Sequence, residues 1–197
     1  MKYPSLDDIA KIQQLIANFS TVERAPKIGG LERRENDVDH SFGLAMTCWY
    51  LHSKIAPELD LLEVIKYALT HDMVELYAGD TFAFDEEGMK SKREREKHSV
   101  RQLAAIYDDF PEIATYADGY MERISEEARF VKAVDKLLPP IMIELGGGEE
   151  WRRLGITLAM EKENKVSLRV SSQIAPYYEL LLQWLDERGN IPKDSGE

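Results

Sequence analysis

Residues 61–80 read LLEVIKYALTHDMVELYAGD, an apolar run that ends in a cluster of ionisable side chains. The apolar residues recur with the period of a helix, and Asp60 just before them is a favourable N-cap residue. Gly79 interrupts the pattern. We therefore predict one helix that begins at Asp60, continues through HDMVEL and breaks at Gly79.

The same helical period recurs along most of the chain, and few stretches have the alternation of a strand. Further helices are predicted at 5–19, 36–55, 90–107, 125–145, 149–163 and 166–188, with loops at 20–35 and 81–89. The prolines Pro139 and Pro140 are expected to interrupt or kink the helix over 125–145. The expected fold is all-α, with one globular multi-helix domain over residues 1–191 and a polar tail over 192–197.

Composition narrows the class of protein. The chain has 197 residues, of which 44% are apolar and 31% charged, and its net charge is −11. The negative charge argues against a general nucleic-acid binder, because phosphate backbones attract clusters of Lys and Arg. No apolar run reaches the length of a membrane span, and the acidic, amphipathic start MKYPSLDDIAKIQQL does not resemble a signal peptide. The single cysteine, Cys48, fits a packed thiol in a cytoplasmic protein.

The spacing of His71, Asp72 and Glu75 places these side chains on or beside one face of a helix. Imidazole and carboxylate groups together suit a divalent transition-metal ion. Two ligands on one helical turn do not hold an ion securely, so further donors are expected from other parts of the chain.

His40 and Asp135 are the candidates for those further donors. His40 lies near the start of a predicted helix, and Asp135 lies on or beside the apolar stripe of another. A buried, unpaired carboxylate costs several kcal/mol, so Asp135 needs an arginine or a metal ion as partner. Taken singly, each of these residues has a more common structural explanation; their combination in one small domain favours a metal site.

The order His40, His71-Asp72, Asp135 resembles the metal-binding signature of the HD superfamily of metal-dependent phosphohydrolases. The segments ERRENDVDHS (32–41), HDMVELYAGD (71–80) and EEARFVKAVDKL (126–137) resemble one branch in particular. That branch contains the bacterial 5′-deoxynucleotidases and their eukaryotic HD-domain relatives. The resemblance covers about residues 20–140.

The resemblance implies a role for each matching residue. It makes His40, His71, Asp72 and Asp135 the ligands of one divalent ion, which the donor set leaves open as Co, Mn, Fe, Zn, Ni or Mg. Glu75 and Asp80 match two acidic residues beside the attacking water, and Arg24 matches an arginine that contacts the substrate phosphate. Ala25 is a departure, because the bacterial deoxynucleotidases have a tryptophan there that packs against the sugar.

The expected activity is therefore a 5′-nucleotidase that releases phosphate from nucleoside or deoxynucleoside 5′-monophosphates, with a small-molecule nucleotide as its partner. One alternative is a pyrophosphohydrolase or triphosphohydrolase, which would call for more cations than Arg24 and the pair Arg33-Arg34 provide. Another is a non-catalytic, nucleotide-binding HD domain. The resemblance and the apolar segment YYELLLQWL (177–185) favour a homodimer, although this segment can equally belong to the core.

Overall fold

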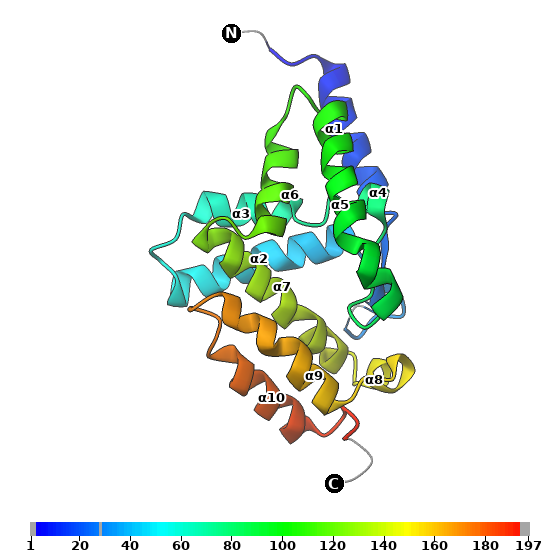
Figure 1. Cartoon of the computed structure of the whole chain (residues 1–197), viewed down its shortest axis with the longest axis vertical. Coiled ribbons are helices and arrows are strands. Elements are labelled where there is room, and N and C mark those ends of the chain that lie inside the picture. The colour runs from blue at the N-terminus through cyan, green and yellow to red at the C-terminus, as the bar shows by residue number, and fades with distance from the viewer. Residues whose placement is uncertain (1–2, 28, 194–197) are drawn as a thin grey trace.

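The computed structural model describes residues 3–27 and 29–193, apart from the side chains of Ala25 and Pro26. The predicted all-α fold is confirmed: helices account for most of these residues, and the strands among them are short (Figure 1). The expected tail over 192–197 falls mainly outside this range, although the Pro192 carbonyl accepts a hydrogen bond from Leu158 N at 2.9 Å.

Helix α1 spans Leu6–Phe19 and begins as the sequence predicts. Ser5 caps it, and Asp8 completes a reciprocal capping box with Ser5. The predicted loop over 20–35 is partly wrong, because strands β1 (Glu23–Lys27) and β2 (Arg34–Asn36) pair there in antiparallel fashion. The pairing joins segments on either side of Gly29-Gly30 that are too short to show an alternating pattern.

Helix α2 spans Asp37–Ile55 and α3 spans Leu61–Thr70. The prediction that α3 continues to Gly79 is wrong: residues 71–74 form a turn, and a separate short helix α4 spans Glu75–Ala78. In the turn, Glu75 N donates to the Asp72 carbonyl at 2.8 Å. In a turn closed by a hydrogen bond between residues three apart, the side chains of those two residues lie on the same side. Asp72 and Glu75 therefore face the same cavity.

Helix α5 spans Glu86–Ile106 and starts earlier than predicted, because Asp85 caps it by accepting from Gly88 N. Helix α6 (Glu112–Glu122) follows. Helix α7 (Glu126–Leu145) continues through Pro139 and Pro140, so of the expected interruption or kink the interruption does not occur. Pro140 is buried, and burial of the helix in the main core can offset the hydrogen bonds that the two prolines cannot make.

The C-terminal part is more broken than predicted. The expected helix over 149–163 is two helices, α8 (Glu149–Leu154) and α9 (Leu158–Asn164), separated at Gly155 in the left-handed conformation. The helix expected over 166–188 is a 3₁₀ segment η1 (Lys165–Val170) followed by α10 (Tyr177–Arg188).

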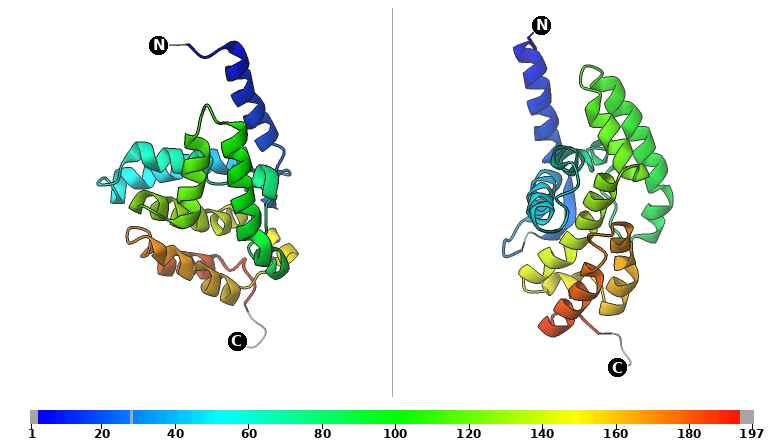
Figure 2. Two further views of the ribbon diagram at one scale, coloured as in Figure 1. Left: turned by 45° about the horizontal axis from the view of Figure 1, so that its top comes forward. Right: turned by 90° about the vertical axis from the view of Figure 1, so that its left-hand side faces the viewer.

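Helix α7 lies in the middle of the molecule (Figure 1). Helices α1, α5 and α6 lie on one side of it, and α8, α9 and α10 lie on the other, as the two further views also show (Figure 2). The main core joins α2, α3 and α7 to the C-terminal helices, and it includes Cys48 and the fully buried Trp151. A smaller core lies between α1, α5 and α6.

Helix α10 contributes to the main core through Tyr178, Leu181 and Leu185. Of the two roles that the sequence leaves open for this segment, packing in the core is therefore the one observed. Within residues 3–27 and 29–193, no helix combines the length and the apolar character that a bilayer span requires.

Candidate metal centre

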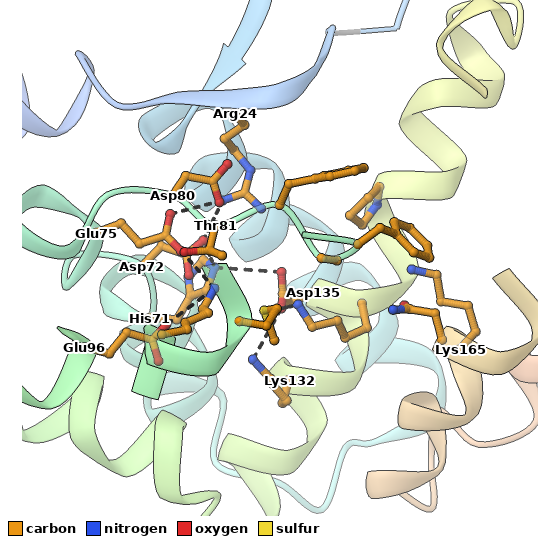
Figure 3. Close-up of a pocket in the computed structure, with 18 of the residues that line it drawn as sticks. Arg24, His71, Asp72, Glu75, Asp80, Thr81, Glu96, Lys132, Asp135 and Lys165 are labelled. Carbon is orange, nitrogen blue, oxygen red and sulfur yellow. Dashed lines mark hydrogen bonds and ion pairs between the residues drawn. The ribbon is translucent and has the colours of Figure 1, made fainter. Parts of the chain in front are cut away.

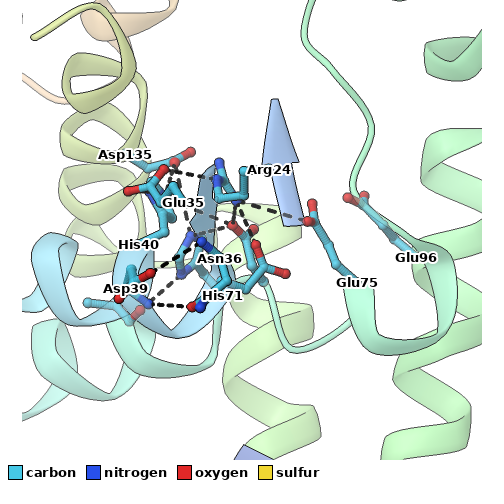
Figure 4. Close-up of polar contacts among 12 residues, drawn as sticks. Arg24, Glu35, Asn36, Asp39, His40, His71, Glu75, Glu96 and Asp135 are labelled. Atoms are coloured by element: carbon cyan, nitrogen blue, oxygen red, sulfur yellow. Dashed lines mark hydrogen bonds and ion pairs between the residues drawn. The ribbon is translucent and has the colours of Figure 1, made fainter. Parts of the chain in front are cut away.

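Four of the residues singled out in the sequence lie close together. Figure 4 shows His40, His71 and Asp135, and Figure 3 shows Asp72 with His71 and Asp135. His40 comes from α2, His71 and Asp72 from the turn after α3, and Asp135 from α7. His40, His71 and Asp135 are at least 97% buried. The helices that carry them pack against one another in the main core, which fixes the relative positions of the four side chains.

His71 is oriented by a backbone contact. Its Nδ1 lies 2.9 Å from the carbonyl of Ala68, one turn earlier, which makes Nδ1 the protonated nitrogen and leaves Nε2 as a lone-pair donor. Nε2 is buried and makes no hydrogen bond within the described part of the chain. A buried nitrogen with a free lone pair, held by a backbone carbonyl on its other side, is the arrangement of a metal-binding histidine.

His40 points its Nε2 at the same place. That atom lies 3.1 Å from Asp135 Oδ1, while Nδ1 lies 3.5 Å from Glu35 on β2. Burial and the charge of Arg24 lower the pKa of His40, but the contacts with Asp135 and Glu35 outweigh them and raise it to about 9. A metal ion takes the place of this proton when it binds.

Asp135 is held on its far side by Tyr120, whose hydroxyl donates to Oδ2 at 2.7 Å. Lys136 lies 3.1 Å from the same carboxylate. Burial opposes the charged form, but Lys136, His40 and the other neighbouring cations together hold the pKa of Asp135 well below its usual value. The carboxylate is therefore ionised, and its Oδ1 is directed towards the two histidines.

Asp72 completes the set. Its Oδ2 lies 2.9 Å from His71 Nε2 and 3.9 Å from His40 Nε2. Burial raises the pKa of Asp72, but His71 and Arg24 outweigh that effect, and the net result is a pKa well below the usual value. The Asp72 carboxylate is therefore also an anionic donor.

The four side chains fit one divalent ion. Neighbouring ligands of an octahedral ion at about 2.1 Å lie ~3 Å apart and opposite ones ~4 Å apart. The donor atoms here are separated by 2.9–4.0 Å across four pairs of a histidine nitrogen and a carboxylate oxygen. Two imidazoles and two carboxylates leave two positions of such a shell for water or a phosphate oxygen.

Glu75 lies beside this cluster and is also buried. One of its oxygens lies 3.4 Å from Lys92 Nζ on α5, and the other makes no hydrogen bond among residues 3–27 and 29–193. Burial first, and then the charges of Asp72 and Asp80, raise the pKa of Glu75 well above its usual value. A carboxyl group with a raised pKa next to a metal site is suited to proton transfer.

A cavity of about 320 Å³ opens beside the cluster (Figure 3). Glu75, Asp80 and Arg24 all line it together with His71, Asp72 and Asp135. Gly79, with a positive φ of 73°, ends α4 and turns the chain so that Asp80 lines the same cavity.

Arg24 reaches into the cluster from β1. Its Nη1 lies 2.7 Å from Asp72 Oδ2 and 3.1 Å from Asp37 Oδ1, and its Nε lies 3.4 Å from Glu35. Arg24 therefore already neutralises carboxylates at the edge of the metal cluster. Arg24 also lines the cavity, so it is in a position to make the phosphate contact that the family resemblance implies for it.

Several residues of the site escaped the sequence analysis. Lys92 lies in the charged run 90–98, where it is one of several similar side chains, yet its ammonium lies 3.4 Å from Glu75. Lys132 and Lys136 flank Asp135 on α7, and their spacing from that residue was the available signal. Arg33, by contrast, is exposed and pairs with Asp39, and neither it nor Arg34 lines the cavity.

A mainly helical domain in which two buried histidines and two aspartates converge beside a cavity is the arrangement expected of a helical protein with a divalent-metal site. A sequence model of the HD-domain family matches residues 16–174. The chain belongs to the HD-domain family, and the resemblance to that family is thereby confirmed.

Curated relatives carry a specific name. The chain is 28% identical over 121 residues to the protein named 5′-deoxynucleotidase HDDC2 of Mus musculus, a match that covers 58% of this chain and 59% of the relative. The human protein of the same name is 26% identical over 129 residues, with 62% of each chain covered. The matched region thus spans about three fifths of the length of these relatives.

Solved structures share the fold over nearly the whole chain. A crystal structure from Magnetospirillum magnetotacticum, described as a predicted metal-dependent phosphohydrolase, superimposes with a TM-score of 0.79 at 26% identity, covering 95% of this chain and 98% of the other. A conserved hypothetical protein from Pyrococcus furiosus has a TM-score of 0.62 at 23% identity, covering 89% of this chain and 99% of the other. The second likeness concerns the fold alone.

Proposed function

We propose that this protein is a metal-dependent phosphohydrolase that releases phosphate from nucleoside or deoxynucleoside 5′-monophosphates. The observation that carries the proposal is the convergence of His40, His71, Asp72 and Asp135 beside the buried Glu75. All of these residues except His40 line one cavity. The names of the curated relatives and of the Magnetospirillum structure support the same reaction class.

The four ligands would hold one divalent ion at the inner end of the cavity. Such an ion polarises a phosphoryl oxygen and lowers the pKa of a nearby water, which matters because phosphate monoesters hydrolyse very slowly without help. The identity of the ion stays open, because imidazole and carboxylate donors accept several divalent metals.

Proton transfer falls to the two acids on the cavity wall. Glu75 is buried with a raised pKa, so it is suited to hold a proton and to donate it to the leaving alkoxide. Asp80 is more exposed and lines the same cavity, where a carboxylate can orient and deprotonate a water. This division of roles follows from the difference in burial.

Arg24 and the cavity lysines suit a phosphate group. Arg24 offers a planar fork of donors, and Lys132 and Lys136 place two further cations next to Asp135. The alternative of a triphosphate substrate gains some support from these lysines. However, Lys92 is paired with Glu75 and Glu96 and Lys136 with Asp135, so the cations largely balance carboxylates already present. This pairing of the cations favours a substrate with one phosphate group over a triphosphate.

The non-catalytic alternative would require only that a nucleotide binds. It gives no role to a buried, proton-holding Glu75 beside the metal ligands, because holding a carboxyl group in that environment is costly. We therefore favour an enzyme.

The test is a panel of mono- and triphosphates of nucleosides and deoxynucleosides, assayed with Mn²⁺, Co²⁺, Zn²⁺, Ni²⁺, Fe²⁺ and Mg²⁺. We expect inorganic phosphate from monophosphates and neither pyrophosphate nor triphosphate from any substrate. Release of triphosphate would favour the alternative enzyme class. Nucleotide binding by the metal-loaded protein without release of any phosphate would overturn the enzymatic proposal.

The homodimer and the cytoplasmic location expected from the sequence stay predictions, as does the single domain over 1–191. Sedimentation of the purified chain tests the oligomeric state directly. Helix α2 carries exposed apolar side chains at Phe42, Met46, Trp49 and Tyr50, so this helix rather than α10 is where substitutions belong in that experiment.

A further inference from the structure

The cavity continues away from the metal ligands to a second polar group. Glu161, Asn164 and Lys165, at the junction of α9 and η1, line its far part. In Figure 3, Lys165 lies on the side of the cavity opposite to Glu75 and His71. None of these three residues belongs to the metal cluster or to the proton-transfer groups described above.

Glu161 and Lys165 are a buried pair with unused hydrogen-bonding capacity. Their side chains are 3% and 5% exposed, and Glu161 Oε2 lies 3.4 Å from Lys165 Nζ. Within the described residues, Glu161 Oε2 and the buried Asn164 Oδ1 make no hydrogen bond. A buried acceptor atom without a hydrogen bond costs free energy, so an ion pair that keeps such an atom at a cavity wall is suited to a polar ligand.

The wall between the two ends is apolar. Phe82 and Phe84, from the loop between α4 and α5, lie with ring centroids 5.5 Å apart, and Ile143, Leu154 and Ile156 line the cavity with them. A flat, aromatic ligand with polar atoms at its edge fits such a space, because its faces contact the apolar wall while its edge meets the polar pair.

We propose that Glu161 and Lys165 recognise the base of the nucleotide and favour guanine. This inference rests on the proposed function, because it takes the phosphate to lie at the metal end. A carboxylate accepts two adjacent hydrogen bonds, and guanine offers N1–H and N2–H side by side. The ammonium of Lys165 donates to the neighbouring O6. Adenine, cytosine and thymine do not offer this pattern, in which a ring N–H and an exocyclic N–H lie side by side next to a carbonyl oxygen.

A second phosphate is a poorer occupant of this end. Glu161 would repel it at close range, and the apolar wall offers it no donors. The charges therefore separate the cavity into a metal end, where Lys132 and Lys136 surround an anionic site, and a far end, where one acid and one base lie together.

The experiment measures kcat/KM for dGMP, dIMP, dAMP, dCMP and dTMP, and in parallel the binding of the same nucleotides at equilibrium. dIMP is a matched probe, because it lacks only the exocyclic amino group of dGMP. For the unmodified protein we expect kcat/KM for dGMP to exceed kcat/KM for dIMP by about tenfold or more. The reason is that dIMP leaves one oxygen of a buried carboxylate without a hydrogen bond. This comparison needs no variant, so it does not depend on folding.

Glu161→Gln replaces one acceptor oxygen by an amide, and we expect it to reduce the dGMP to dIMP ratio at least fivefold. Glu163→Gln is the matched control, because Glu163 is exposed on the same helix and does not line the cavity; the ratio should stay as in the unmodified protein.

Equal rates for all five bases, or equal ratios in Glu161→Gln and Glu163→Gln, would overturn the base assignment while leaving the phosphatase intact. Tighter binding of dGMP without phosphate release from any nucleotide would support the base site and overturn the proposed enzymatic function.

Discussion

The metal assignment makes a sharp prediction for Asp72→Ala and Glu75→Gln. Asp72→Ala removes a donor atom that lies 2.9 Å from His71 Nε2, so we expect it to abolish metal retention and activity together. Glu75→Gln changes a residue that we place outside the ligand set, so it should reduce turnover while the ion stays bound.

The structure indicates that Asp72→Ala keeps the fold. Arg24 retains Asp37 at 3.1 Å and Glu35 at 3.4 Å after the loss of Asp72, so no buried cation is left unpaired. The substitution also removes one of several carboxylates that repel one another, since the charge of Asp72 contributes to the raised pKa values of Asp37 and Glu75. Without metal, the unfolding temperature of the variant should therefore lie close to that of the original protein.

The magnitude follows from linkage. An ion present at 100 times its dissociation constant stabilises the protein by about 2.7 kcal/mol, which for a chain of this size corresponds to ~5–11 °C in Tm. The assay is thermal unfolding with and without chelator, together with elemental analysis of the purified protein.

We expect chelator to lower the unfolding temperature of the original protein, of Glu75→Gln and of the control variant Asp118→Ala. Asp118 is an exposed residue of α6. Chelator should leave the unfolding temperature of Asp72→Ala unchanged. The role assignment fails if Glu75→Gln loses its metal as completely as Asp72→Ala, or if Asp72→Ala keeps the full shift.

Three further predictions concern the surroundings of the site. Tyr120→Phe removes the hydroxyl that donates to Asp135 at 2.7 Å and should weaken metal binding by about 10–100-fold, measured by competition with a metallochromic chelator. Trp151→Ala empties a fully buried position and removes a donor to Glu144, so urea unfolding should show a loss of about 3–5 kcal/mol. Burial raises the pKa of the Cys48 thiol, so it should react with a thiol reagent at pH 8 only after denaturation.

Each of these predictions has a result that contradicts it. Unchanged metal affinity in Tyr120→Phe would mean that Asp135 is oriented by its lysines alone. A loss below 1 kcal/mol in Trp151→Ala would contradict the packing described for the main core. Stoichiometric labelling of Cys48 in the native protein would show that the centre of α2 opens on the time scale of the reaction.

Local sequence patterns were sufficient for the elements that begin with a good cap and carry a long helical period. Helix α1 with its Ser5 cap, α2 after Asn36 and α7 after Ser125 all start where the sequence predicts. Each of these helix starts depends on a capping side chain that accepts a hydrogen bond from a backbone N–H three residues later. A short stretch of sequence is therefore enough to predict it.

The chemistry of the metal site was also present in the sequence, as residue types in a recognisable order. His40, His71, Asp72 and Asp135 were named from motif and spacing, and the structure brings them to one point. The helical argument for the spacing of His71 and Glu75 was wrong in detail, however, because the chain forms a tight turn there.

Only the tertiary structure decided which charges share the cavity. Lys92, Glu161 and Lys165 are separated from the metal ligands by long stretches of chain, and their own neighbourhoods resemble solvated helix surfaces. Burial by distant helices turns these surface-like residues into parts of a cavity wall. The sequence by itself therefore determined the fold class and the family, and it named the candidate metal ligands, because these depend on local pattern and residue type. The shape and charge of the substrate end depend on contacts between segments far apart in the chain, and no local pattern records them.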